Sequence, residues 1–503
     1  MNGNYGLTGP SGVSLLACLA LVLSALPQGR SGTALAAEVA GGLQVVGTTD
    51  YDLDFTSRHT EIEIRGDHVF VGSFIPLDEN GMSAFKVGDV SDPSNPVLAT
   101  HFLLPGAVLD TQVNLDEDRC GYGKQLFGLG DPACNTVLAA TQAAPNDADG
   151  IWLIDARDPA AALHWGWDSS KPMSEQVGFI NRPLRGAHNG FLFGDYAFAA
   201  GIGEASFEIW DIRPLFQSPP APPTLTATFS NTRDTRPVKA LLERERTHDL
   251  FVQRNPDGRV FAYVAGPQAY IVDVTDVIAG TQSGDISGNL VAFNNYINED
   301  GTVTVQGFTT GGNGHYAEPS DDGGHTYVGD ETGCGEPGII HIFDTADLPQ
   351  VGEPPRQLTE VGVLSWPTSK APMCANRHAD GNPPDGQNRN GDITNLARTG
   401  HNFRIYGDIM THGNYSEGAF IWDISNRADP GLLAQFRGLD GRECQGKRAE
   451  TPDEKRLYRL CGSFWQVVSD GDPAAVLAGE QYIYGSDRAV GLYVFRLRPN
   501  GAQ

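Results

Sequence analysis

A short apolar segment that ends in aspartate recurs along the chain and limits the possible folds more than any other feature. Each copy is followed by a turn that is often rich in Asp and Pro. The copies read FKVGDVSDPSNP, IWLIDARDP, FEIWDIRPL, YIVDVTD, IHIFDTADLP and FIWDISNRADP, and they place Asp89, Asp155, Asp211, Asp273, Asp344 and Asp423 at equivalent positions. These aspartates are 66, 56, 62, 71 and 79 residues apart, which is the scale of a four-stranded blade with insertions.

The rest of each unit also predicts strands. A second apolar segment precedes each copy, as in VFVGSF and TVLAATQ, and a further strand precedes that one. The 61 glycines and 32 prolines suit a chain that is dense in turns and all-β. A seventh unit, FWQVVSDGDPAAVLAGEQYIYGSDRAVGLYVFRLR, has Arg496 in place of the aspartate and lacks a fourth strand.

The segment GLQVVGT at residues 42–48 can supply that missing strand, because it resembles the outer strands of the other units. Closing the array in this way removes the open sheet edges that a linear stack would expose. We therefore predict an all-β, seven-bladed β-propeller in which the N-terminal strand completes the last blade. It forms a single domain over residues 37–503, with an insertion loop at 366–398.

The repeat resembles a known family. The turn pattern in GDVSDPSNP and WDISNRADP is similar to that of LVIVD-repeat propellers and their secreted choice-of-anchor B relatives, with the best agreement over residues 400–430. The resemblance covers residues 42–497 at the level of the repeat and implies the propeller fold. It implies little about activity, because one propeller scaffold carries many unrelated functions.

The N-terminal segment predicts export. An apolar run, VSLLACLALVLSAL at residues 13–26, precedes small residues at 34–36 that are typical of a cleavage site, so we interpret residues 1–36 as a signal peptide. No later run approaches the roughly 20 apolar residues that a membrane-spanning helix needs. The mature chain is therefore expected to be secreted or periplasmic, without a membrane span.

The cysteines are consistent with an oxidising compartment. Removing the leader leaves six, for which sequence proximity favours disulfides between Cys120 and Cys134, Cys334 and Cys374, and Cys444 and Cys461. Other connectivities remain open, since six cysteines can pair in 15 ways.

The charge of the chain excludes two classes of partner. There are 35 Lys and Arg residues against 62 Asp and Glu residues, a net charge of −27. Nucleic acids and anionic membrane surfaces need clustered positive charge, so neither is an expected partner.

Histidines recur at one position of the repeat, the start of the innermost strand. Five of the seven units carry one there, while Gln112 and Gln466 stand at about this position in the other two. The five are His59, His188, His248, His315 and His401. Because innermost strands surround the propeller axis, these side chains are expected to form a ring at one mouth of the channel.

A ring of imidazoles predicts a metal site. Imidazole is the commonest protein ligand for late transition metals; we favour copper or iron, with zinc or manganese as alternatives. The loops after the second strands reach the same face, which brings Glu331 there as an acid–base group, with Asn414, Tyr415, Asp487 and Arg488 as further neighbours. The alternative is architectural, since repeats also reuse polar residues to hydrogen-bond adjacent blades.

Other polar residues have simpler interpretations. The six repeated aspartates are expected to cap turns, and the remaining histidines to lie on the surface or between blades. His412 is the exception to watch, because a small shift in register would bring it toward the mouth. The loop CANRHADGNPPDGQNRNGDITNLAR offers hard oxygen ligands for Ca²⁺, but its spacing does not match an EF-hand loop, so we favour an ordinary polar insertion. Its oxygen donors are Asp380, Asp385, Asn388, Asn390 and Asp392.

Two functions follow from these observations. The first is a secreted metal-dependent oxidoreductase that acts on a small-molecule substrate entering the channel mouth. The second is a non-catalytic LVIVD-repeat propeller that binds a protein or polysaccharide at the cell surface. Motifs for serine hydrolases, zincins, nucleotide enzymes and heme attachment are absent from the sequence.

Overall fold

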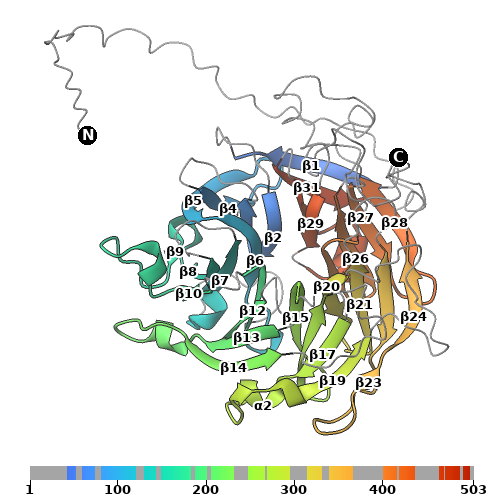
Figure 1. The fold of residues 1–503 in the computed structure, drawn as a ribbon. Helices are drawn as coiled ribbons and strands as arrows, with labels where there is room; N and C mark the ends of the chain where they lie inside the picture. Colours follow the sequence, from blue (N-terminus) through green and yellow to red (C-terminus); the bar gives the residue numbers. More distant parts are fainter. Residues whose placement is uncertain are drawn as a thin grey trace, which may run out of the picture. The chain divides into compact units, whose positions relative to one another are not determined.

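The repeat folds into seven antiparallel sheets around a common axis, as the computed structural model shows (Figure 1). The structure describes residues 42–51, 59–73, 81–120, 130–142, 149–182, 187–200, 206–230, 247–266, 269–294, 314–330, 339–365, 400–415, 418–436, 464–469, 471–487 and 491–498. The predicted leader at 1–36, the insertion loop at 366–398 and its calcium-ligand candidates lie outside these residues.

The first four blades follow the chain from the inner to the outer strand. Blade 1 contains β2 (His59–Arg65), β3 (His68–Ser73), β4 (Met82–Asp89) and β5 (Val97–Pro105). Blade 2 contains β6 (Ala107–Val113), β7 (Thr136–Gln142), β8 (Gly150–Asp155), β9 (Leu163–His164) and β10 (Phe179–Asn181). Blade 3 contains β11 (Asn189–Phe193), β12 (Tyr196–Ala200), β13 (Ser206–Asp211) and β14 (Thr224–Ser230), with β18 (Gly284–Asp285) added in parallel. Blade 4 contains β15 (Asp249–Arg254), β16 (Val260–Ala265), β17 (Ala269–Asp273) and β19 (Leu290–Asn294), with β23 (Arg356–Gln357) added in parallel.

The last three blades continue the same order. Blade 5 contains β20 (Gly314–Pro319), β21 (His325–Asp330), β22 (Ile340–Asp344) and β24 (Thr359–Leu364). Blade 6 contains β25 (Phe403–Tyr406), β26 (Ile409–Asn414), β27 (Gly418–Asp423) and β28 (Gly431–Phe436). Blade 7 contains β29 (Phe464–Ser469), β30 (Tyr482–Asp487), β31 (Gly491–Leu497) and β1 (Leu43–Thr49).

Helices in the described residues are short and lie between strands. They are α1 (Glu117–Cys120), α2 (Thr275–Ile278) and α5 (Pro473–Leu477), with 3₁₀ turns at Ala133–Asn135, Pro159–Ala161, Met173–Glu175, Arg213–Phe216 and Ser287–Asn289. Over the part of the chain that is described, none of the helices has the length and apolar character needed to span a bilayer.

The N-terminal strand closes the ring, which confirms the predicted seven-bladed fold. β1 pairs antiparallel with β31, from Leu43 opposite Leu497 to Thr49 opposite Leu492. Apolar side chains then fill the space across the closure, where Val468 and Tyr484 of blade 7 belong to one buried cluster with Ile62 of blade 1. The propeller core is therefore the set of layers between neighbouring blades.

The repeated aspartates cap turns, as predicted. In each of the six units the Asp Oδ1 accepts a hydrogen bond from the backbone N–H two residues later, at distances of 2.8 to 3.1 Å. This local bond ends the third strand and begins the turn to the fourth. The aspartates therefore explain the repeat and belong to the scaffold.

The Cys120–Cys134 disulfide is present and ties α1, which follows the inner strand of blade 2, to the 3₁₀ turn before the second strand. Both cysteines are buried, and the Arg65 guanidinium of blade 1 donates hydrogen bonds to their two carbonyl oxygens. The bridge thus also joins blades 1 and 2. The other predicted pairs lie outside the described residues.

Candidate metal centre

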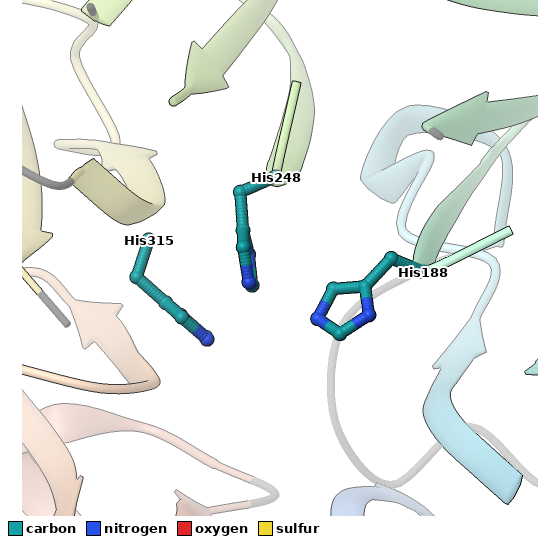
Figure 2. A group of neighbouring side chains, drawn as sticks. All are labelled: His188, His248 and His315. Atoms are coloured by element: carbon teal, nitrogen blue, oxygen red, sulfur yellow. The ribbon is translucent and has the colours of Figure 1, made fainter. Parts of the chain in front are cut away.

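Three of the predicted histidines meet at one mouth of the channel. His188 and His248 directly precede β11 and β15, and His315 is the second residue of β20, so they come from three successive blades. One ligand nitrogen from each ring lies within 4.8 Å of the others. The ring centroids are 4.3 Å apart for His188 and His248 and 3.9 Å apart for His248 and His315. Figure 2 shows the three side chains pointing toward a shared space.

Hydrogen bonds hold the first two of these histidines. The backbone N–H of His188 donates to the carbonyl of Ala200 at 3.1 Å, and that of His248 to the carbonyl of Ala265 at 2.8 Å. The side-chain oxygen of Gln142 also lies 3.0 Å from Nδ1 of His188. An amide oxygen can only accept, so Nδ1 of His188 carries the proton and Nε2 of the neutral ring is unprotonated.

The third histidine is held in its neutral form. His315 is 3% exposed, and burial, followed by the nearby His401 and His188 rings, lowers its pKa well below the ordinary value. Neutral imidazole is the form that binds metals. The lowered pKa of His315 therefore favours the form that could act as a ligand.

His401 lies next to this group but is not one of its three members. Its ring centroid is 4.0 Å from that of His315, which continues the row of imidazoles. Its Nδ1 is 2.8 Å from the carbonyl oxygen of Trp465, and its ring packs against Tyr415 and Trp465. A neutral His401 would therefore donate from Nδ1, and its ring orientation is set by blades 6 and 7.

His59 is placed apart from the other histidines. Its ring packs against Tyr51, with centroids 5.6 Å apart, and it is fully buried. A shift in pairing register follows His59 in β2, and a similar shift occurs around His315 in β20. Burial and the nearby Lys86 charge lower the pKa of His59 well below its ordinary value. The structure thus brings together three of the five predicted ligands.

The two glutamines do not complete the histidine row. Gln112 is the sixth residue of β6, not the first, and its side chain accepts a hydrogen bond from Arg404 at 2.9 Å. Gln466 lies within β29, where its side-chain oxygen accepts from the backbone N–H of Ile62 at 2.8 Å. The expectation that they occupy the histidine position is wrong, because both lie farther along their strands.

Only some of the residues that we predicted to lie near the histidines are described by the structure, and one of them, Tyr415, contacts the row. Glu331, the candidate acid–base group, and Arg488 lie outside the described residues. Tyr415 does reach the row and packs on His401 with centroids 4.3 Å apart. Asn414 and Asp487 are buried at the ends of β26 and β30. His412 stays inside blade 6, where it stacks on Phe420, so it does not reach the mouth.

A buried polar network joins the innermost strands farther along their length. Arg404 of β25 donates to Glu63 of β2, to Gln112 of β6 at 2.9 Å and to the Tyr316 hydroxyl of β20 at 2.6 Å. Glu318 accepts from the Tyr316 hydroxyl at 2.8 Å. Four blades are thereby joined through one guanidinium.

A second buried network lies in blade 5. His341 of β22 contacts Asp330 through Nε2 at 3.1 Å and Glu360 through Nδ1 at 2.8 Å. Burial alone would lower the pKa of His341, but the Asp330 charge and the hydrogen bonds to both carboxylates raise it to about 9. The imidazolium therefore connects three adjacent strands of this sheet.

This network gives stability a pH dependence. The folded-state pKa of His341 is above its unfolded value of about 6.5, so its contribution is complete below pH 6.5 and is lost as the pH rises to about 9. We expect His341→Gln to cost about 2–3 kcal/mol at pH 6 and much less at pH 9.5. Urea unfolding at both pH values measures this, with exposed His101→Gln as the control. An equal loss at the two pH values would contradict the assignment.

Neither Gln142 as a partner of His188 nor the network around Arg404 was predicted from the sequence, although the sequence carries a signal for each. Gln142 ends the second strand of blade 2, the same position in the repeat that led us to Glu331 and Asn414 in other blades. Glu63, Glu318 and Arg404 occupy innermost strands, where a polar residue that breaks an apolar segment faces the axis or a neighbouring blade.

Comparisons with known proteins found similarity to solved structures alone. Neither a protein-family description nor a curated protein matches the chain. Among solved structures, the chain is similar to the Cps50 (Swd1) β-propeller domain from Myceliophteria thermophila, with 10% identity, a TM-score of 0.48, and coverage of 90% of this chain and 99% of that one. It is also similar to a putative 6-phosphogluconolactonase from Bacteroides fragilis, with 11% identity, a TM-score of 0.43, and coverage of 89% and 97%. Neither similarity bears on the activity of this chain.

Proposed function

We propose that the chain binds one transition-metal ion through His188, His248 and His315 and uses it as a metal-dependent oxidoreductase on a small molecule. The observation that carries the proposal is the convergence of three imidazole nitrogens within 4.8 Å. Ligands in a tetrahedral site with bonds of about 2.1 Å are roughly 3.4 Å apart, so modest side-chain rotations bring the three to a common ion. Three imidazoles leave a coordination position for a substrate.

The ligand type agrees with a redox metal. Imidazole suits copper, iron and zinc, and we favour copper or iron, with zinc and manganese as alternatives. When bound, such a metal supplies electron transfer or Lewis-acid chemistry. Gln142 orients His188 through its hydrogen bond, and burial keeps His315 neutral. Residues around metal ligands commonly orient the ligands and keep them in the form that binds. Glu331 remains our candidate for moving a proton at the same mouth.

The cellular setting is part of the proposal. We take residues 1–36 as a signal peptide and the mature protein as secreted or periplasmic. The Cys120–Cys134 disulfide agrees with an oxidising compartment. The similarity of the repeat to LVIVD-repeat and choice-of-anchor B propellers points the same way, and a non-catalytic propeller of that kind, binding a protein or polysaccharide, is the alternative function.

Metal analysis of the protein purified without a histidine tag tests the proposal. After incubation with copper, iron, manganese or zinc and removal of excess ion, we expect about one equivalent of one metal per chain. The His188→Ala/His248→Ala/His315→Ala variant should retain less than about a tenth of it. Occupancy below about 0.2 equivalents with all four metals in the wild-type chain would leave only the non-catalytic alternative.

A further inference from the structure

A separate cavity of about 160 Å³ lies at the other end of the innermost strands. Its walls include Glu63, Phe251, Glu318 and Arg404, and it shares no residue with the histidine cluster. His315 and Glu318 are three residues apart in β20, a rise of about 10 Å along the axis. Because the histidines lie at or next to the starts of these strands, the cavity lies toward the opposite ends of the strands.

The charged residues that line this cavity are five acidic and three basic ones: Glu63, Asp116, Asp118, Glu318 and Asp321 against Arg65, Arg254 and Arg404. Glu63 and Glu318 lie on either side of the Arg404 guanidinium, and all three are at least 95% buried. Burial raises the pKa of Glu63 to about 7 and that of Glu318 to about 8, although the Arg404 charge lowers both. When Glu63 and Glu318 are both ionised, they carry two negative charges, and the single positive charge of Arg404 balances only one of them.

More buried acidic groups lie near Arg404. Three further buried carboxyl groups approach this guanidinium, from Glu61, Asp110 and Asp249. Burial raises the pKa of each of them, because an isolated charge is costly in a low-dielectric interior. A raised pKa favours the neutral carboxyl group, so the negative charge that a cation in the cavity would meet comes from Glu63 and Glu318.

The walls of the cavity are suited to the carbon skeleton of a ligand. Phe193 and Phe251 contribute aromatic rings, and Val113, Val252 and Ile405 contribute aliphatic side chains. The Arg404 guanidinium already lies 5.4 Å from the Phe251 ring centroid. Aromatic faces attract cations, and the Arg254 guanidinium lies 5.8 Å from the Phe193 ring centroid. The apolar part of the lining favours an alkyl chain over a hydrated inorganic ion.

We propose that this cavity binds a small alkylammonium compound, with its charged group against Glu63 and Glu318 and its alkyl chain against Phe193 and Phe251. The site is independent of the histidine cluster and of any metal bound there. An anionic ligand would face the surplus carboxylates, and a neutral ligand would gain nothing from them.

Three probes of the same length test the proposal on the wild-type chain: n-pentylamine, 1-pentanol and pentanoate. By isothermal titration calorimetry at pH 8 we expect pentylamine to bind with a Kd of about 1 mM or tighter, and the alcohol and the carboxylate at least about tenfold more weakly. Undetectable binding of pentylamine, or equal binding of pentylamine and pentanol, would overturn the proposal.

Isosteric variants locate the site. Glu63→Gln and Glu318→Gln should each weaken pentylamine binding at least about threefold, and together at least about tenfold, whereas exposed Glu175→Gln removes the same charge elsewhere and should have no effect. His248→Ala should also bind pentylamine normally, which separates this site from the metal proposal. Unchanged affinity in the folded Glu63→Gln/Glu318→Gln variant would assign binding elsewhere; the probe comparison does not depend on how the variants fold.

Discussion

Replacing His248 with alanine should weaken transition-metal binding by at least about 100-fold. His248 is the middle member of the cluster, with ring contacts to both His188 and His315, so its loss leaves two ligands separated by a gap. The measurement is a competition titration against a chromophoric chelator. A second readout is the rise in Tm at a fixed metal concentration, which should be much smaller in the variant than in the wild-type chain.

Two controls make this result specific. His101→Ala removes an exposed histidine from the outer strand β5 and should leave the affinity unchanged. His401→Ala removes the ring next to His315 and should reduce the affinity less than His248→Ala does, because His401 is not among the three convergent ligands. Wild-type affinity in a folded His248→Ala chain would contradict the three-histidine site.

Replacing Arg404 with methionine should destabilise the propeller by about 3–5 kcal/mol at pH 8. The guanidinium bonds to Glu63, Gln112 and Tyr316, which come from three other blades. Without it, ionised Glu63 and Glu318 would be buried near each other with no cation between them. Methionine retains much of the side-chain volume, so loss of charge dominates over the creation of a cavity.

The pH dependence distinguishes this effect from a packing defect. The folded-state pKa values of Glu63 and Glu318, about 7 and about 8, are above the ordinary glutamate value, so the stability that these groups contribute is complete at low pH and is lost as the pH rises toward 8. Removing Arg404 raises both pKa values further. We therefore expect a smaller loss in the variant at pH 5, where both carboxyl groups are protonated, than at pH 8.

Urea unfolding at the two pH values provides the measurement. Arg157→Met is a suitable control, because that side chain is 59% exposed and its ion pair with Asp155 should contribute less than about 1 kcal/mol. A loss below about 1 kcal/mol for Arg404→Met at both pH values would show that the buried carboxyl groups do not depend on this guanidinium.

The fold was predictable because its signals are local. Each unit repeats an aspartate whose capping bond reaches only two residues along the chain, as Asp89 does to Ser91. In the sequence, blade 7 lacks a fourth strand, and the segment at 42–48 resembles an outer strand but belongs to no other blade. The segment was therefore expected to complete blade 7. β1 begins within that segment and pairs with β31, as this complementarity indicated.

The composition of the site was less predictable, because it depends on register. β6 begins at Ala107, directly after the short turn from β5, so Gln112 lies well inside the channel. Pairing shifts in β2 and β6 also change which residues face the axis, and the sequence carries no clear signal for them. His188, His248 and His315 come from three consecutive blades, and here the repeat placed equivalent residues together.

The partners of Arg404 could not be predicted from the sequence. A polar residue on an innermost strand is recognisable in sequence, but its partner is not, since Arg404 and Glu63 are 341 residues apart. Their pairing follows from closure of the ring. His341 was expected to pack between blades or at the surface, yet it joins two carboxylates within its own sheet.

X-ray absorption spectroscopy of the chain loaded with one equivalent of copper or zinc tests most directly whether separate blades share one ion. We expect a first shell with three imidazole nitrogens at about 2.0–2.1 Å, reduced to two in His248→Ala and absent in the triple alanine variant. A first shell with fewer than two imidazoles in the wild-type chain, or one that the triple substitution leaves unchanged, would contradict the metal centre.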